Sequence, residues 1–271
     1  MGKLIFLDVD GTIVPLGQLP GKMTVEAIRT ARAKGHKVFL STGRREADVP
    51  ETVRSIGFDG GIYSAGGRAV VSGKEILNRP MPEALVQQAI GFLQEWGLYF
   101  ILEGAGGAYV GTKNQTFSKT VRQMIRLLQA ELQIADQKQR PEHDPVYKII
   151  FLADSDAQIK QVVRQLSAAA TIVYSSSLFP GIPSFTGEIS GMNINKGDAL
   201  TRICEYLNAD IKDCIAFGDS MNDIEILQAA GLGVAMGNAD DCVKAIADRV
   251  CESCEEDGVA KALARMNLIQ R

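Results

Sequence analysis

Short apolar runs alternate with helical patterns at both ends of this chain, and this rhythm constrains the fold more than any other feature. Before residue 81, apolar runs predict strands over Lys3–Leu7, Val38–Leu40 and Gly61–Tyr63. The patterns between them predict helices over Thr24–Lys34, with Thr24 as the N-cap, and over Arg45–Ile56. Short strands that are apolar on both faces and separated by helices are typical of a parallel sheet with helices on both sides.

The same rhythm returns after Asn195. Strands are predicted over Cys214–Phe217, Gly233–Ala235 and Arg249–Val250, and helices over Lys196–Leu207, Asn222–Ala230, Asp240–Ala247 and Val259–Met266. We therefore expect residues 1–81 and 190–271 to form one discontinuous α/β domain with a doubly wound, Rossmann-like parallel sheet.

The stretch between these two parts has a different rhythm. Pro80 and Pro82 interrupt the pattern at its start, as is common in linkers. Strand-like runs such as Tyr99–Leu102 and Tyr147–Leu152 then stand beside helical patterns. Paired strands beside helices favour an α+β architecture, so we expect residues 82–189 to form an inserted α+β domain.

The charge balance excludes some classes of partner. The chain has 29 Lys and Arg against 32 Asp and Glu, a net charge of −3. Mainly electrostatic binding to nucleic acid or to an anionic membrane requires an excess of basic residues or a dense basic stripe. The balance of charge in this chain argues against such partners. No apolar stretch approaches the length of a membrane span, and Asp8 ends the first apolar run too early for a signal peptide. We expect a soluble, cytoplasmic protein.

The five cysteines all lie in the last quarter of the chain. Cys251 and Cys254 form its one CxxC motif, which has no second pair and only two histidines in the chain to complete a zinc site. We expect reduced thiols packed as small apolar residues.

Acidic residues follow the first predicted strand, in Asp8-Val9-Asp10-Gly11-Thr12. Ligands of doubly wound sheets bind at the carboxyl ends of strands, and an acidic pair there is unfavourable unless a cation neutralises it. Gly11 permits a tight turn whose backbone N–H groups could face an anion. Taken alone, the motif also fits an acidic surface turn.

A second acidic motif closes the strand at Cys214–Phe217, in Gly218-Asp219-Ser220-Met221-Asn222-Asp223. By itself it also fits a well-capped turn before a helix. Two acidic strand ends in one parallel sheet, however, form an oxygen-only site of the kind that suits Mg²⁺ with a phosphate as co-ligand.

Two further segments could bind phosphate. Thr42-Gly43-Arg44 ends the second strand, where a hydroxyl and a free N–H could reach phosphate oxygens, although a helix cap is an alternative explanation. Lys196 opens a helix, where a lysine opposes the helix dipole unless an anion lies nearby. A solvated surface lysine is the alternative there.

In this order, four motifs resemble those of the haloacid dehalogenase (HAD) superfamily of phosphohydrolases. They are Asp8-x-Asp10-Gly11-Thr12, Thr42-Gly43-Arg44, Lys196-Gly197-x-Ala199-Leu200 and Gly218-Asp219-x-x-Asn222-Asp223. The insertion before Lys196 is similar to the large cap of the Cof-type subfamily (IIB). Gly237-Asn238-Ala239 and Gly258-Val259-Ala260 also match that subfamily's C-terminal pattern.

The resemblance implies a Mg²⁺-dependent phosphatase that hydrolyses a small phosphorylated metabolite, such as a sugar phosphate, through an aspartyl-phosphate. It implies Asp8 as nucleophile and Asp10 as general acid and base. It further implies a metal site made of Asp8, Asp10 through its carbonyl, Asp219 and Asp223. The implied phosphate ligands are Gly11, Thr42, Gly43, Lys196 and Asn222.

Two other functions fit the same motifs: a phosphomutase of the phosphomannomutase type, and a HAD scaffold that binds without catalysis. The chain also departs from the Cof-type pattern, which has Asn-Gly-Ala after the third strand, because it reads Ser64-Ala65-Gly66-Gly67. Ala65 lacks the amide that often reaches toward substrate, which leaves the substrate contacts open. Specificity is expected to come from the inserted domain.

Overall fold

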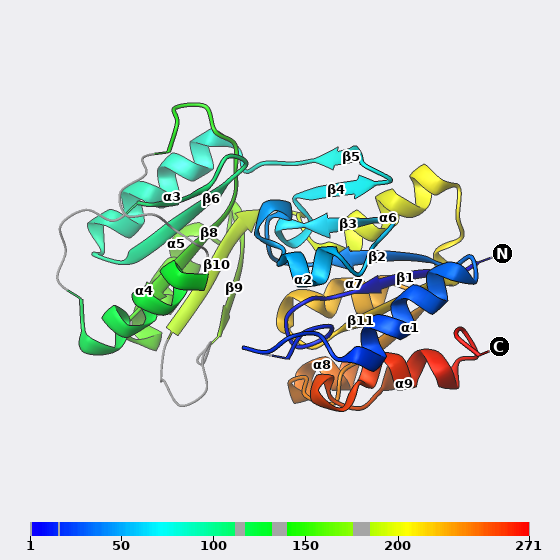
Figure 1. Ribbon diagram of the computed structural model, residues 1–271. Helices are drawn as coiled ribbons and strands as arrows, with labels where there is room; N and C mark the ends of the chain where they lie inside the picture. Colours follow the sequence, from blue (N-terminus) through cyan, green and yellow to red (C-terminus); the bar gives the residue numbers. More distant parts are fainter. Residues whose placement is uncertain (1, 16, 112–116, 132–139, 176–184, 271) are drawn as a thin grey trace. The chain divides into compact units, whose positions relative to one another are not determined.

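The chain divides into two compact units. The computed structural model describes residues 2–15, 17–111, 117–131, 140–175 and 185–270 (Figure 1). One unit comprises Met1–Asn78 and Ile194–Arg271, and the other comprises Arg79–Asn193. The predicted division between residues 189 and 190 falls inside a strand, Phe185–Gly191, that belongs to the second unit. Gly187 and Glu188 interrupt the apolar pattern of this strand, so the sequence pattern did not predict it.

The discontinuous unit is built on an eight-stranded sheet with the order β13-β12-β11-β1-β2-β3-β4-β5. Six strands are parallel: β1 (Leu4–Leu7), β2 (Lys37–Ser41), β3 (Gly60–Tyr63), β11 (Cys214–Gly218), β12 (Leu232–Ala235) and β13 (Arg249–Val250). The predicted doubly wound α/β core is confirmed. At one side of the sheet, β4 (Arg68–Val71) and β5 (Lys74–Asn78) are antiparallel, and these two strands were not predicted from the sequence.

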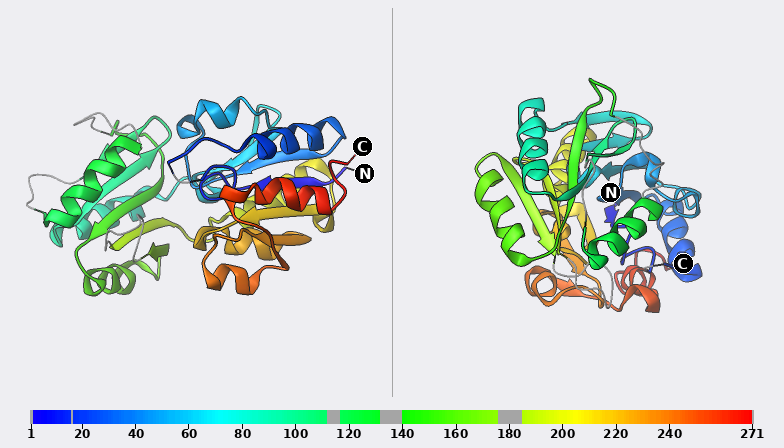
Figure 2. Two further views of the ribbon diagram at one scale, coloured as in Figure 1. Left: turned by 60° about the horizontal axis from the view of Figure 1, so that its bottom comes forward. Right: turned by 90° about the vertical axis from the view of Figure 1, so that its left-hand side faces the viewer.

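Helices cover both faces of this sheet (Figure 2). They are α1 (Lys22–Ala33), α2 (Glu51–Arg54), α6 (Lys196–Leu207), α7 (Ile224–Ala229), α8 (Asp241–Ile246) and α9 (Gly258–Arg265). Successive side chains of β1 point to opposite faces of the sheet. Ile5 and Leu7 pack in the core beneath α1 and α9. Leu4 and Phe6 pack in the core beneath α6 and α7. Helices α1 and α9, from opposite ends of the chain, lie side by side.

Two local predictions in this unit were wrong. The helix predicted over Arg45–Ile56 is a 3₁₀ turn at Glu46–Asp48 followed by the short α2, because Pro50 stands between them. Helix α1 begins at Lys22 after the N-cap Gly21, so Thr24 is not its cap. The Thr24 hydroxyl instead donates to Asp257 Oδ1 at 2.8 Å, a contact across the fold.

The second unit is an α+β structure with its own core. Its sheet is antiparallel throughout, in the order β7-β6-β8-β10-β9. The strands are β6 (Tyr99–Gly104), β7 (Ala108–Val110), β8 (Val146–Ala153), β9 (Ala170–Ser175) and β10 (Phe185–Gly191), and the helices are α3 (Glu83–Glu95), α4 (Lys119–Glu131) and α5 (Asp156–Leu166). Apolar side chains fill both faces of this sheet, with α3 and α5 over one face and α4 over the other.

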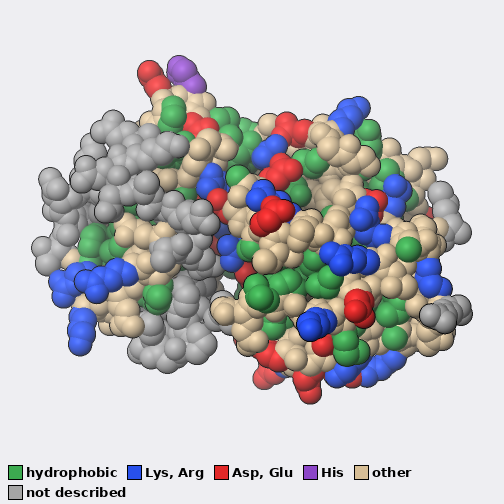
Figure 3. Space-filling view, viewed as in Figure 1, with side chains coloured by type: hydrophobic (Ala, Val, Ile, Leu, Met, Phe, Trp, Pro, Cys, Tyr) green, Lys and Arg blue, Asp and Glu red, His purple; other side chains and the backbone are tan. Residues whose placement is uncertain are grey.

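The visible face of the discontinuous unit carries mixed charges. Lys and Arg side chains are interspersed with Asp and Glu side chains there, in keeping with the near balance of charge in the sequence (Figure 3). Among the described residues, no helix combines the length and the apolar composition that crossing a membrane requires.

Candidate active site

The predicted site residues follow three neighbouring parallel strands. Asp8 comes directly after β1, and Asp10 lies two residues further on. Asp219 follows β11 and Thr42 follows β2, and these strands are adjacent in the order β11-β1-β2. Because the carboxyl ends of parallel strands meet at one edge of a sheet, residues far apart in the sequence converge there. A 3₁₀ turn at Met221–Asp223 and the start of α6 complete this edge.

Lys196, the first residue of α6, is fully buried in the middle of the cluster. Its Nζ donates to Asp8 Oδ1 at 2.8 Å, to Asn222 Oδ1 at 2.9 Å and to Asp223 Oδ1 at 2.7 Å. Three acceptors satisfy the three protons of an ammonium group. Burial alone would lower the pKa of Lys196, but the charges of Asp223 and Asp8 outweigh burial and raise it. These carboxylates are the anions that offset the unfavourable helix dipole.

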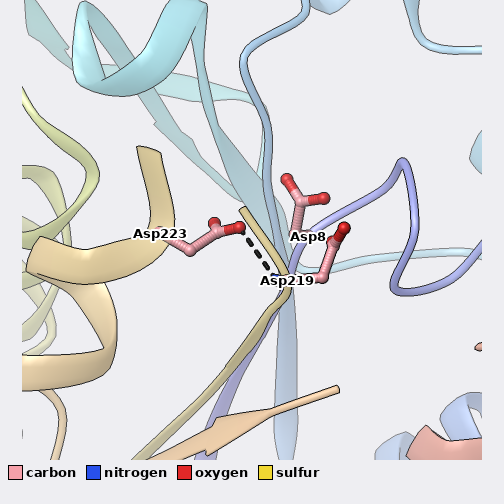
Figure 4. A group of neighbouring side chains, drawn as sticks. All are labelled: Asp8, Asp219 and Asp223. Carbon is pink, nitrogen blue, oxygen red and sulfur yellow. Dashed lines mark hydrogen bonds between the residues drawn. The ribbon is translucent and has the colours of Figure 1, made fainter. Parts of the chain in front are cut away.

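Three carboxylates gather around this lysine. One oxygen from each of Asp8, Asp219 and Asp223 lies within 4.8 Å of the others (Figure 4). Asp223 Oδ2 accepts the backbone N–H of Asp219 at 3.1 Å, which fixes one carboxylate against the loop that carries another. The Thr12 hydroxyl donates to Asp219 Oδ1 at 3.1 Å. The contacts hold side chains from β1, β11 and the following turn in one place.

Burial and neighbouring charge raise the pKa of two carboxyl groups in the cluster, Asp8 and Asp219. Burial raises the pKa of Asp219 to about 7, and the charge of Asp223 adds to the effect. Burial also raises the pKa of Asp8, an effect that Lys196 only partly opposes. Lys196 supplies one positive charge against three carboxylates, so the cluster is net negative when all three are ionised.

This donor set fits a divalent cation. Three carboxylates and one ammonium leave two net negative charges, which one Mg²⁺ ion neutralises. Carboxylate oxygens are the ligands that Mg²⁺ prefers, and a magnesium site commonly keeps several waters beside one or two carboxylates. Asp8, Asp219 and Asp223 can therefore hold Mg²⁺ without soft or nitrogen ligands.

Asp10 lies beside this cluster in a different environment. Arg44 donates to both of its oxygens, from Nε at 2.7 Å and from an Nη at 2.8 Å. The Asp10 side chain is 44% exposed, whereas that of Arg44 is 16% exposed. Thr42 Oγ1 accepts the backbone N–H of Arg44 at 3.1 Å, so the turn through Gly43 places the guanidinium. The ion pair between Asp10 and Arg44 was not predicted from the sequence.

Gly11 is required where it stands. Its φ of +86° suits glycine, and a Cβ there would lie 2.2 Å from Asp219 Oδ2. Asn238 supports the same turn: its Nδ2 donates to the Gly11 carbonyl at 2.9 Å, and its Oδ1 accepts the backbone N–H of Cys254 at 2.9 Å. The sequence pattern Gly237-Asn238-Ala239 marked this residue without revealing its contacts.

The loop after β3 holds the Thr42–Arg44 turn from the other side. The backbone N–H of Ala65 donates to the Thr42 carbonyl at 3.1 Å, and that of Ser64 donates to the Arg44 carbonyl at 2.8 Å. Ser64, Ala65 and Gly66 all have positive φ, at 51°, 53° and 105°. Two residues that are not glycine thus adopt a conformation that costs energy, in a loop that touches the site.

Comparison with known sequences agrees with this geometry. The sequence model of the haloacid dehalogenase-like hydrolases matches residues 5–263, which span both units and every motif described above. The chain belongs to this family. The resemblance drawn from the motifs is confirmed, and the protein is a HAD-type phosphoric monoester hydrolase.

Named relatives of this HAD hydrolase are phosphatases. It is 31% identical to the 5-amino-6-(5-phospho-D-ribitylamino)uracil phosphatase YcsE of Bacillus subtilis, over 96% of this chain and 94% of that protein. It is 26% identical to the pyridoxal phosphate phosphatase YbhA of Escherichia coli, over 96% of each chain.

Solved structures share the fold. The HAD subclass IIB sugar phosphatase BT4131 superposes with a TM-score of 0.82 at 24% identity, over 98% of this chain and 100% of that one. The phosphatase BT1666 from Bacteroides thetaiotaomicron gives a TM-score of 0.81 at 24% identity, over 99% of this chain and 96% of that one. The HAD hydrolase therefore shares the fold of these structures, a mainly parallel core with an inserted α+β unit.

Proposed function

We propose that this HAD hydrolase is a Mg²⁺-dependent phosphatase that cleaves a small phosphorylated metabolite through an aspartyl-phosphate on Asp8. The observation that carries the proposal is the contact of buried Lys196 with Asp8 and Asp223 in an otherwise acidic cluster. A buried carboxylate fixed by one cation and still surrounded by negative charge suits a nucleophile that works beside a metal ion.

The chain's own residues account for both steps. Lys196 holds Asp8 by Oδ1, and we assign the attack on phosphorus to Oδ2. As the new O–P bond forms, the bond from phosphorus to the leaving oxygen breaks, and that oxygen takes a proton from Asp10. Asp10 then takes a proton from the water that attacks phosphorus, which releases inorganic phosphate and restores the Asp8 carboxylate.

Arg44 constrains the role of Asp10. Both Asp10 oxygens accept from the guanidinium, so proton donation to a leaving group requires this pair to separate. A phosphate dianion is a strong competitor for an arginine fork. We propose that substrate draws Arg44 away from Asp10 as it binds.

The remaining residues position the phosphate. Asp8, the Asp10 carbonyl, Asp219 and Asp223 would hold Mg²⁺, which would supply positive charge that reduces repulsion between nucleophile and phosphate. The ammonium group of Lys196 supplies a second positive charge, which the protein itself holds in place. We further propose that backbone N–H groups at Gly11 and Gly43 and the Thr42 hydroxyl bind phosphate oxygens. Asn222 Oδ1 accepts from Lys196, so we propose that Asn222 mainly orients this lysine and offers its NH₂ group to phosphate.

Substitution of the nucleophile tests the mechanism. Asp8→Asn keeps an acceptor for Lys196 but is a poor nucleophile, so we expect kcat for a general aryl phosphate to fall by about 10³-fold or more. The matched control is Asp210→Asn, a carboxylate that caps a 3₁₀ turn remote from the site, which should retain full activity. Appreciable turnover by folded Asp8→Asn protein, with deamidation excluded by mass, would contradict the proposal.

The same assay separates a phosphatase from a phosphomutase. A phosphatase releases inorganic phosphate from a monophosphate without a bisphosphate activator, whereas a mutase returns the phosphoryl group to a sugar. The substrate panel should begin with 5-amino-6-(5-phospho-D-ribitylamino)uracil and pyridoxal phosphate, because relatives 31% and 26% identical carry these names. Sugar phosphates complete the panel.

We propose that the unit of residues 79–193 is the cap and sets substrate specificity. It is inserted between the Thr42 turn and Lys196, and its own apolar core supports independent folding. A chimera that carries the corresponding segment of YcsE should adopt the substrate ranking of YcsE. If the chimera folds and keeps the ranking of this chain, specificity resides in the discontinuous unit.

A further inference from the structure

Two buried thiols face each other beneath α6. Cys204, in the last turns of α6, and Cys214, the first residue of β11, have their Sγ atoms 3.1 Å apart. Their exposed fractions are 4% and 0%. The sulfurs of a disulfide lie about 2.05 Å apart, so about 1 Å of approach separates this pair from a covalent bond.

The other three thiols have different neighbours. Cys251 Sγ lies 3.5 Å from Met236 Sδ, and Cys254 Sγ donates to the Thr12 carbonyl at 3.1 Å. The exposed Cys242 lies 3.3 Å from Met221 Sδ. Thus the CxxC motif visible in the sequence is not the pair that the fold brings together.

We propose that Cys204 and Cys214 are an oxidisable dithiol that a peroxide converts to a disulfide. The Cys204 thiolate attacks one oxygen of hydrogen peroxide, the O–O bond breaks, and the departing hydroxide takes a proton to become water. Cys214 sulfur then attacks the sulfenic acid on Cys204, the S–O bond breaks, and a second water leaves. The two thiols lose two electrons and two protons in total, and the peroxide is reduced to two waters.

Local electrostatics favours this order of events. A hydrogen bond joins the two sulfurs, in which either thiol can be the donor. With Cys214 as the donor, this bond lowers the pKa of Cys204 and raises that of Cys214. In that arrangement Cys204 is the first to react, because the thiolate is the nucleophile. Because both thiols are buried, the oxidant must be small, and hydrogen peroxide meets that requirement.

The bond would strengthen the fold without reaching the site. Cys214 begins β11, whereas Asp219 follows the end of that strand. The dithiol therefore lies at the opposite end of the strands from the cluster of Asp8, Asp219 and Asp223. The disulfide would tie α6, which carries Lys196, to the strand that leads to Asp219. We expect oxidation to raise the thermal unfolding midpoint by several degrees and to leave kcat within about twofold.

The test uses the full chain with Cys242→Ser, which removes the exposed thiol. After treatment with hydrogen peroxide, titration of the denatured protein should find two thiols where the untreated variant has four. Trypsin cuts after Arg202 and Lys212, so Cys204 and Cys214 fall in the separate peptides 203–212 and 213–244. Without reductant these peptides should appear as one species two hydrogens lighter than their sum, and reductant should separate them.

Three outcomes would overturn the proposal. The first is a disulfide between Cys251 and Cys254 in place of the expected one. The second is survival of all four thiols under conditions that oxidise Cys242 in the unsubstituted chain. The third is the formation of higher sulfur oxides without a cross-link. Cys204→Ala in the same background should abolish the cross-link and the rise in the unfolding midpoint. Failure of the proposed phosphatase activity would leave these measurements unchanged, so the two proposals are tested separately.

Discussion

The ammonium nitrogen of Lys196 lies 2.8 Å from Oδ1 of Asp8, and neither side chain is more than 7% exposed. Asp8 follows β1, the first strand of the chain, and Lys196 begins α6, the first helix after the second unit. This ion pair therefore joins the two sequence segments that form the discontinuous unit. It also couples stability to the candidate site, because a change in either partner leaves charge buried.

Removal of the lysine should destabilise the fold. Lys196→Met leaves Asp8 and Asp223 without their cation, and loss of one partner of a buried pair costs about 3–5 kcal/mol. The free energy of unfolding, measured by urea denaturation without metal, should fall by this amount. The control is Lys160→Met, which removes an exposed ion pair with Asp156 and should leave the denaturation midpoint nearly unchanged. An equal effect of both substitutions would contradict the assignment.

Stability and metal binding should depend on pH through Asp219. Its pKa is raised to about 7 in the folded protein by burial and by Asp223, whereas an unfolded chain has the ordinary value near 4. Between about pH 4 and 7 the metal-free folded state holds a proton that the unfolded state has lost. The free energy of unfolding should therefore fall as pH rises through this window and level off above it.

Mg²⁺ must displace that proton below pH 7, so its affinity should rise with pH, by up to about tenfold per unit, and level off above pH 7. Calorimetry in buffers of different ionisation enthalpy measures both the affinity and the proton released. Asp219→Asn is the matched variant, in which the dependence should weaken. A pH-independent affinity in the unsubstituted protein would exclude Asp219 as a ligand that binds only when ionised.

Relief of strain at Ala65 should stabilise the protein. Its φ of +53° costs a residue with a Cβ roughly 1–2 kcal/mol, and asparagine and glycine tolerate this region better. We expect Ala65→Asn to raise the free energy of unfolding by about 0.5–1 kcal/mol. Ser72→Asn is the matched control, because Ser72 has φ +49° in the turn between β4 and β5 and lies outside the candidate site.

Both substitutions should stabilise, but only Ala65→Asn should alter KM across the substrate panel, because this loop holds the Thr42–Arg44 turn. If Ala65→Asn leaves every KM unchanged while Ser72→Asn stabilises as expected, the loop after β3 supports the fold without contributing to substrate recognition.

Asn238 should act as a positioning residue for the loop of Asp8 and Asp10. Asn238→Ala removes the bonds to the Gly11 carbonyl and the Cys254 N–H. We expect kcat to fall by about 10–100-fold through misplacement of the loop, because small displacements of reacting groups are costly. KM should change little, and the unfolding free energy should drop by only about 1 kcal/mol. A loss of stability without any loss of kcat would show that these bonds serve the fold alone.

The sequence by itself determined the doubly wound core and the edge at which the site lies. Runs such as Leu4–Leu7 and Cys214–Gly218 are apolar on both faces, which only a sheet covered on both sides accommodates. Since parallel strands end at a common edge, the placement of Asp8 and Asp219 after their strands was enough to predict that they converge. Strand β10 was missed because its polar and glycine residues obscure the pattern.

Only the tertiary structure decided which side chains pair. Nothing local distinguishes Arg44, bound to Asp10, from Arg45, which pairs with Asp48 one turn away. Likewise the Cys251–Cys254 spacing stood out in the sequence, but the fold brought Cys204 to Cys214. Local propensity and periodicity act over a few residues, whereas these pairings depend on how a turn or a helix is packed against the sheet. That packing is fixed by contacts between distant segments, which no single stretch of sequence specifies.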